Sequence, residues 1–93
     1  MATSEGRLVL SDLTLMAIQA EATRAHLRHG SNSMLYQDAT NERRLAIITE
    51  ELGEVARELN EAAIRGGLAE YKLEMELIQV AAMAASWIEV LNS

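Results

Sequence analysis

The sequence predicts an all-α fold, a helical bundle that is completed by homo-oligomerisation. The chain has 93 residues with no Pro, no Phe and only 3% aromatic residues, which argues against the tight turns and aromatic pairs of small β-sandwiches. Apolar residues recur at helical spacing, and capping residues and glycines divide the chain into three segments. The length allows one domain, residues 1–93, in which residues 1–10 are expected to form a loose N-terminal segment.

The first helix is expected to begin at Ser11 or Asp12 and to end at His29. Ser11 can cap the helix, and the acidic Asp12 favours the positive end of the helix dipole. Basic side chains occupy the last turn before Gly30, which is a typical C-terminal stop. The next stretch, residues 30–41, has the Gly, Ser and Asn content of a loop. Its Met34, Leu35 and Tyr36 are more apolar than a solvated loop needs.

The second helix is predicted to begin at Thr40 or Asn41 and to run to Arg65, where two glycines follow. Its apolar residues follow steps of three and four, which is typical of a packing seam. The members of this predicted seam are Leu45, Ile48, Leu52, Val55 and Leu59.

The third helix is predicted from Leu68 or Ala69 to Leu91. After Glu76 it is apolar or small on every side except at two polar positions, so it has no face suited to solvent. Part of this helix is therefore expected to pack against another subunit, in a homodimer or homotetramer. The residues expected at that contact are Trp87 and the small Ala81, Ala82, Ala84 and Ala85.

The composition excludes several partners. Fourteen acidic residues against eight basic ones leave no electrostatic footprint for nucleic acid. The longest uncharged helical stretch, residues 77–88, is too short for the roughly 18 residues of a membrane span, and no secretory signal is visible. The absence of Cys is compatible with a reducing compartment. A cytoplasmic protein that binds neither nucleic acid nor membrane is expected.

The second helix carries an acidic stripe. At 100° per residue, Glu51, Glu54 and Glu58 fall within about 60° of one another, along the edge of the predicted seam. Glu50 and Glu61 extend the run of acidic residues. A solvated charged face is the simplest interpretation of such a stripe.

The third helix favours a second interpretation. Glu76 opens its most apolar stretch, and Gln79 follows three residues later on the same face. An ionised carboxylate beside a core must lie at the rim, be protonated, pair with a cation or bind a metal. Antiparallel packing of the two helices would bring Glu51 and Glu54 against this pair. Such a set of oxygen ligands selects Mg²⁺, with Mn²⁺ as a substitute.

The stretches ITEELGEVARELNE and EMELIQVAAMAASWIEVL, taken together, resemble the MazG-like all-α nucleoside triphosphate pyrophosphohydrolases. The family signature is E-E-x-x-E on one helix and E-x-x-D on a later one. The resemblance implies hydrolysis of a nucleoside triphosphate to the monophosphate and pyrophosphate with Mg²⁺. It places Glu51, Glu54 and Glu76 at metal-ligand positions and Glu50 at the leading acidic position.

The resemblance also suggests roles in catalysis and substrate binding. Glu50 or Glu51 could accept the proton of the attacking water. Lys72 and Arg65, together with Arg43 or Arg44, are candidate phosphate contacts, although ordinary surface cations are the commoner case. Tyr36 could stack on the base, or it could anchor its loop in the core.

Gln79 stands where the family pattern has Asp, and this departure keeps two alternatives open. A Gln side chain offers a carbonyl oxygen but no negative charge, so a cation is held less strongly. The chain could then be a non-catalytic module that binds a nucleotide or a protein partner, or a plain oligomerisation scaffold with a solvated acidic stripe. The pair His26 and His29 is expected to complement the dipole of the first helix rather than to bind metal.

Overall fold

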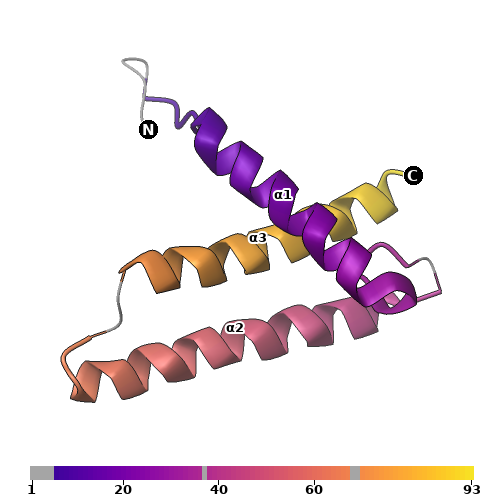
Figure 1. The fold of residues 1–93 in the computed structure, drawn as a ribbon. Coiled ribbons are helices and arrows are strands. Elements are labelled where there is room, and N and C mark those ends of the chain that lie inside the picture. Colours follow the sequence, from indigo (N-terminus) through magenta and orange to yellow (C-terminus); the bar gives the residue numbers. More distant parts are fainter. Residues whose placement is uncertain (1–5, 37, 68–69) are drawn as a thin grey trace.

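A computed structural model describes residues 6–36, 38–67 and 70–93 and has three α-helices within them. These are α1 (Asp12–His29), α2 (Asn41–Ile64) and α3 (Glu70–Leu91), with a short 3-10 turn, η1 (Gly30–Asn32), after α1. The helices α2 and α3 lie side by side and antiparallel, and α1 crosses over α3 (Figure 1). The all-α prediction is confirmed for the described part of the chain.

The helix ends follow the local signals in the sequence. The hydroxyl of Ser11 accepts a hydrogen bond from the Thr14 N–H (3.2 Å), and that of Thr40 accepts one from the Arg43 N–H (3.0 Å). Gly30 ends α1 with a φ of 54°, a left-handed conformation that glycine adopts without strain. The predicted bounds of α1 and α2 are confirmed to within a residue. The predicted start of the last helix, residues 68–69, lies outside the described residues.

The loop between α1 and α2 is held by the buried guanidinium of Arg44, which is 3% exposed. Arg44 donates to the carbonyl oxygens of Met34 (2.9 Å) and Ala39 (2.6 Å) and also to that of Tyr36. Three backbone acceptors of the loop are thus satisfied by one side chain from the first turn of α2. Arg44 is therefore a structural residue, and the interpretation of this cation as a phosphate contact is wrong.

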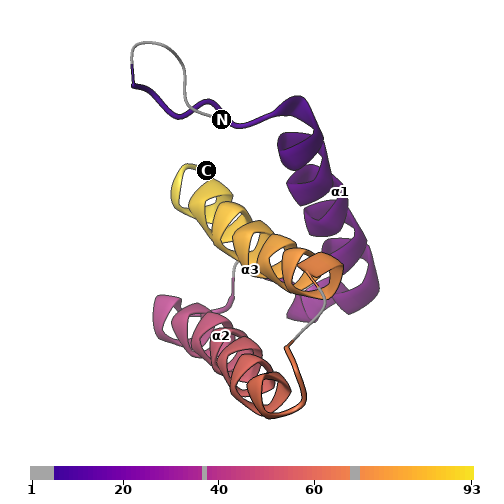
Figure 2. The ribbon, with the colours of Figure 1, turned by 90° about the vertical axis from the view of Figure 1, so that its left-hand side faces the viewer.

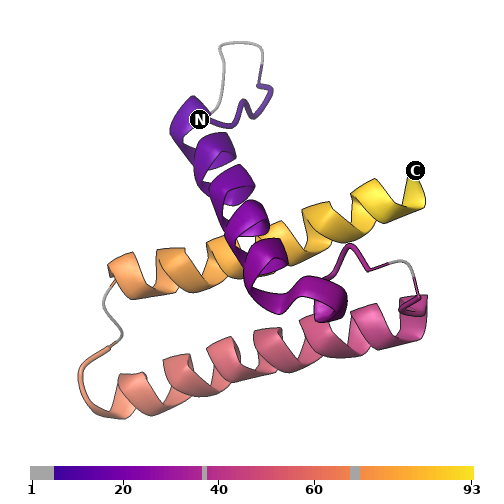
Figure 3. The same ribbon diagram turned by 45° about the vertical axis from the view of Figure 1, so that its right-hand side comes forward.

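The helix α3 is central, because α1 and α2 each pack against it and not against each other within the described residues (Figures 1 and 3). Near the C-terminal end of α3, the indole N–H of Trp87 donates to the Asn41 side-chain oxygen at the start of α2 (3.0 Å). Antiparallel packing of α2 and α3, as expected from the sequence, is therefore confirmed. Trp87 contacts α2 of its own chain.

The predicted seam on α2 is only partly buried. Val55 is buried and Ile48 half-buried, but the leucines of the seam are exposed. The row that faces α3 is rotated towards the acidic stripe: Arg44, Val55 and Ala62 are its buried members. Only Val55 and Ile48 of the predicted seam are thus covered, because the rotation of a helix about its axis depends on its partner and not on its own periodicity.

Among the residues that the structure describes, no helix has the length and apolar character needed to cross a bilayer.

Candidate functional site

The interface between α2 and α3 places carboxyl groups of the two helices against each other. Glu51 and Glu58 lie on α2, Glu76 lies on α3, and all three side chains are half-buried. The Oε2 atoms of Glu58 and Glu76 are buried and have no hydrogen-bond partner among the described residues. Buried acceptors without a partner are uncommon in folded proteins and call for a proton, a water or a cation.

The surroundings of two of these carboxyl groups favour their neutral form. The pKa of Glu76 is raised first by the approach of the Glu58 carboxyl, with which a protonated Glu76 can share its proton in a hydrogen bond, then by burial and by the charges of Glu58 and Glu51, and it is lowered by the nearby Lys72 ammonium. The pKa of Glu51 is raised by burial first, and then by the charges of Glu54, Glu58 and Glu50. Glu51 and Glu76 therefore hold protons more tightly than ordinary glutamates, and the Lys72 ammonium offsets this effect only in part at Glu76.

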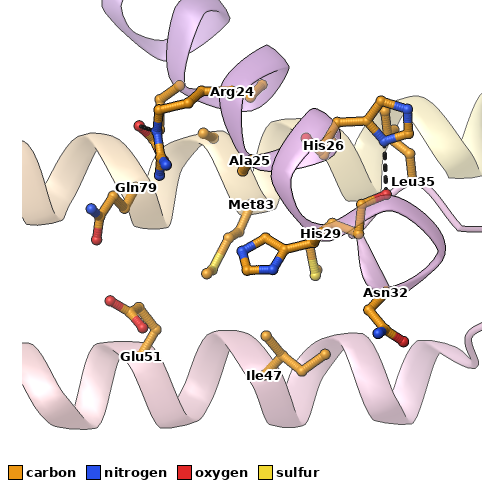
Figure 4. A pocket seen from close by; sticks show the side chains of 16 residues that line it. Arg24, Ala25, His26, His29, Asn32, Leu35, Ile47, Glu51, Gln79 and Met83 are labelled. Atoms are coloured by element: carbon orange, nitrogen blue, oxygen red, sulfur yellow. Dashed lines mark hydrogen bonds and ion pairs between the residues drawn. The ribbon is translucent and has the colours of Figure 1, made fainter.

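A cavity of about 310 Å³ adjoins this cluster, enclosed by α1, the loop after it, α2 and α3. Glu51 and Gln79 approach each other across the cavity from α2 and α3 (Figure 4). Its apolar lining consists mainly of Met34, Leu35, Ile47, Ala82 and Met83. The apolar residues of the 30–41 loop thus fold back and help to form a site.

The helix α1 supplies polar groups to the same cavity. Arg24 forms a two-pronged ion pair with Glu21 (2.8 and 2.5 Å), which lowers the pKa of the Glu21 carboxyl. The Nδ1 atom of His26 lies 2.8 Å from the Ser33 hydroxyl, and this contact joins α1 to the loop. The imidazole of His29 projects into the cavity, towards α2 (Figure 4).

The remaining predicted site residues lie at various distances from the cluster. Glu50 and Glu54 are exposed and close enough to Glu51 to raise its pKa, and Lys72 is exposed beside Glu76. Arg65 caps the C-terminal end of α2 and does not line the cavity. Tyr36 is exposed, so it does not anchor its loop in the core, and it lies outside the lining of this cavity. Stacking of Tyr36 on a base stays a prediction.

The donor set fits a hard divalent cation in its chemistry. Glu51, Glu54 and Glu76 offer carboxylate oxygens and Gln79 an amide oxygen, and Glu58 and Glu76 each contribute a buried oxygen without a partner among the described residues. Within residues 6–36, 38–67 and 70–93, however, no three His, Asp or Glu side chains converge closely enough to coordinate one ion. Coordination would require side chains of α2 and α3 to turn towards one another.

Two residues of the site, Glu58 and His29, were not predicted as site residues from the sequence. Glu58 is the direct neighbour of Glu76, and its signal was its place in the acidic stripe, one turn after Glu54. His29 enters the cavity although its position at a helix C-terminus suggested only a dipole contact. No local pattern indicates this role, since it depends on how α1 crosses α3.

Comparison of the chain with models of known protein families, with curated proteins and with solved structures found no match. The resemblance to the MazG-like family therefore stays a prediction.

The raised pKa of Glu76 predicts a pH-dependent effect on stability. A carboxyl whose pKa is higher in the folded state stabilises the fold fully below its unfolded-state pKa, near 4.5, and this contribution is lost as the pH rises through the raised value. The Glu76→Gln variant, which removes the charge at constant size, should therefore have a higher Tm than the parent at pH 7.5. The difference should close as the pH approaches 4.5.

Thermal unfolding followed by circular dichroism at pH 4.5, 6 and 7.5 measures this effect. Glu61→Gln is the matched control, because Glu61 is an exposed glutamate of α2 outside the cluster. A Glu76→Gln variant that is destabilised equally at all three pH values would show that Glu76 is held ionised by a partner.

Proposed function

We propose that this protein is a Mg²⁺-dependent enzyme that hydrolyses nucleoside triphosphates to the monophosphate and pyrophosphate. One observation carries the proposal: Glu51 and Glu58 on α2 meet Glu76 on α3 in a cluster with two unpartnered buried oxygens, beside a cavity that Glu51 and Gln79 share. This arrangement agrees with the paired signature that resembles the MazG-like family.

In the proposed site, Glu51, Glu54, Glu76 and Gln79 would hold the cation, with Glu58 within reach of the same position. When bound, Mg²⁺ supplies the positive charge that lets an acidic site accept a triphosphate, and it acidifies water. Gln79 contributes an amide oxygen and no charge. The cluster is short of cations of its own, and this supports a metal-dependent rather than an arginine-dependent mode of phosphate binding.

Glu51 is the better candidate for the general base. It lines the cavity that we propose for the substrate, whereas Glu50 does not. In the hydrolysis, water attacks the α-phosphorus, its proton passes to a carboxylate, and the bond from that phosphorus to the oxygen of the leaving pyrophosphate breaks.

The cavity would accept the nucleoside part of the substrate. Its volume of about 310 Å³ is at the lower end of the range for small-molecule sites. The side chains of Met34 and Met83 offer adaptable apolar contact to a base, while Arg24 and His29 are polar groups within reach of sugar or phosphate. Arg65 and Tyr36 do not line this cavity, so Arg24 and His29 are the polar contacts that we propose within it.

The experiment that tests the proposal measures pyrophosphate release from a panel of ribo- and deoxyribonucleoside triphosphates, with Mg²⁺, Mn²⁺ or EDTA. We expect turnover of at least one nucleotide with either metal and none with EDTA. Absence of turnover with every nucleotide at saturating metal would reject the enzymatic function.

A second candidate function is a non-catalytic module that binds a nucleotide or a protein partner on the same scaffold. Two observations favour it: Gln79 lacks the charge of the Asp in the family pattern, and no three acidic or His side chains of the described chain converge on one ion position. Isothermal titration with Mg²⁺ and a non-hydrolysable nucleotide separates the two functions. Binding without turnover identifies the module, and absence of both leaves an oligomerisation scaffold.

Restoring a charge at position 79 should strengthen metal binding. We expect Gln79→Asp to lower the Kd for Mg²⁺ roughly tenfold, since the affinity of such sites follows the number of charged ligands. Gln79→Glu keeps the original side-chain length and is the matched variant. Isothermal titration with Mg²⁺ alone gives both constants, and an unchanged or weaker affinity in both variants would place residue 79 outside the coordination shell.

A further inference from the structure

The α2–α3 hairpin has two faces, and only one of them is covered by α1. Glu51 on α2 and Ser86 on α3 line the cavity on the covered side. Figure 2, which looks along α3, shows α1 and α2 on two of its sides and no helix on the side away from α1. The residues on that uncovered side determine what it can bind.

Large apolar side chains occupy the uncovered side of α2. Leu52 lies about 60° round the helix from the buried Val55 in one direction, whereas Glu51 lies about 40° from it in the other. Leu45 and Leu59 lie seven residues before and after Leu52. Uncharged residues that share this face complete an exposed row with steps of four and three: Leu45, Thr49, Leu52, Ala56, Leu59 and Ala63.

The uncovered side of α3 has the same character. Ile88 lies roughly 160° round the helix from Ser86, and Leu91 continues its row. The small Ala84 lies one turn before Ile88, so large and small side chains alternate here as they do on α2. We call the five large residues of the two rows the open face: Leu45, Leu52, Leu59, Ile88 and Leu91.

The open face is too apolar for a surface that stays in water. Its five residues are 39 to 61% exposed, and no charged residue interrupts either row. Among the described residues the buried apolar core is limited to Val55, Ala62 and Ala82. Three buried apolar residues contribute little to the free energy of unfolding of a 93-residue chain. We therefore expect further apolar surface to be buried in the stable state of the protein.

We propose that the open face is the contact between two copies of this chain, which pack their α2–α3 hairpins face to face as a homodimer. A second copy brings the same uncharged rows, and its alternation of large and small side chains lets ridges of one copy fill the grooves of the other. A partner of opposite charge would have no acidic group to recognise on this face. The cavity lies on the other side of the hairpin and stays accessible in the dimer.

The size of the open face agrees with this occupant. The 24 residues of α2 extend over about 36 Å, and two neighbouring helices are about 20 Å wide, so a face-to-face contact covers on the order of 700 Å² on each copy. Stable dimers use roughly 800 Å² per partner. Leu77 and Ala81 do not belong to this face, because they line a separate groove of about 500 Å³ with Leu13 and Ile18 of α1.

Sedimentation equilibrium of the intact chain at 1–100 µM tests the proposal. The parent protein should have twice the 10.2 kDa chain mass. Ile88→Glu should raise the dimer dissociation constant at least 100-fold, because it introduces a charge into the contact. Ile64→Glu is the matched control: Ile64 is 88% exposed on α2 outside the open face, and its replacement should leave the dimer intact.

A measurement on the unmodified sequence covers the case in which Ile88→Glu does not fold. In a mixture of ¹³C-labelled and unlabelled chains, intermolecular NOEs should connect methyl groups of Leu52 and Ile88 with those of the second copy. A monomer at 100 µM overturns the proposal, and so does a dimer whose intermolecular NOEs arise from Leu13 or Leu27 of α1. Neither outcome bears on nucleotide hydrolysis.

Discussion

The Glu51→Gln variant should release pyrophosphate from nucleoside triphosphates at least 100-fold more slowly than the parent protein. In the proposed site Glu51 both holds the cation and accepts the proton of the attacking water, and Gln can do neither as well. Loss of a general base alone reduces rates by about 10² to 10⁴. The measurement is kcat/KM for the best substrate of the panel at saturating Mg²⁺, together with the Kd for Mg²⁺.

The Glu61→Gln variant is the control for this loss, since it makes the same substitution on an exposed part of α2. A loss of activity in Glu51→Gln through unfolding is not expected, because burial and three neighbouring carboxylates raise the pKa of Glu51 and already oppose its charged form. The variant should therefore melt at or above the Tm of the parent at pH 7.5. Full activity in Glu51→Gln would exclude Glu51 as base and as metal ligand.

The helices of this protein could be predicted from the sequence because their signals are local. Ser11 and Thr40 accept hydrogen bonds from backbone N–H groups three residues away, and Gly30 needs only its own left-handed conformation. The antiparallel pairing of α2 and α3 followed from a short connection between two long apolar helices. Each of these features depends on a few residues that are near one another in the sequence.

The rotation of α2 about its own axis could not be predicted in the same way. The apolar pattern favoured the row of Leu52 as the face towards α3, but the structure turns Glu51 and Glu58 into that interface and leaves the leucines outside. The leucine row and the row of Val55 and Ala62 are both possible faces of α2 towards α3, and the sequence pattern does not show which of them is preferred. The same rotation explains why Glu58 was not singled out, since its contact with Glu76 is a tertiary one.

This rotation links the candidate site to the open face. Turning the leucine row of α2 onto α3 would bury more apolar area in the single chain, but it would carry Glu51 away from Gln79. The observed arrangement keeps the carboxyl groups beside the cavity and leaves the leucines for a partner. The single chain thus lacks the stabilisation that burial of the leucine row would give, and the proposed dimer supplies it by burying the same leucines. Such a compromise between stability and function is common in proteins.

Replacing Arg44 by Met should destabilise the fold by about 3 kcal/mol, the largest effect on stability that we expect from a single substitution outside the apolar core. Arg44 is almost fully buried and donates to three carbonyl oxygens of the loop that closes one end of the cavity. Hydrogen bonds from a charged donor contribute about 1.5 to 3 kcal/mol each, and part of this loss is recovered when the freed carbonyls meet water. For a domain of this size the Tm should fall by roughly 12 to 24 °C.

The Arg43→Met variant is a close control, because it removes the same charge from the neighbouring position, where the side chain is exposed. Its Tm should stay within about 3 °C of the parent, as is usual for surface substitutions. Chemical unfolding of both variants in urea gives the difference directly. Equal stability of the two variants would mean that the loop holds its place without Arg44.

Since the loop carries Met34 and Leu35 into the cavity, partial unfolding in Arg44→Met should also weaken binding of a non-hydrolysable nucleotide, whereas Arg43→Met should not.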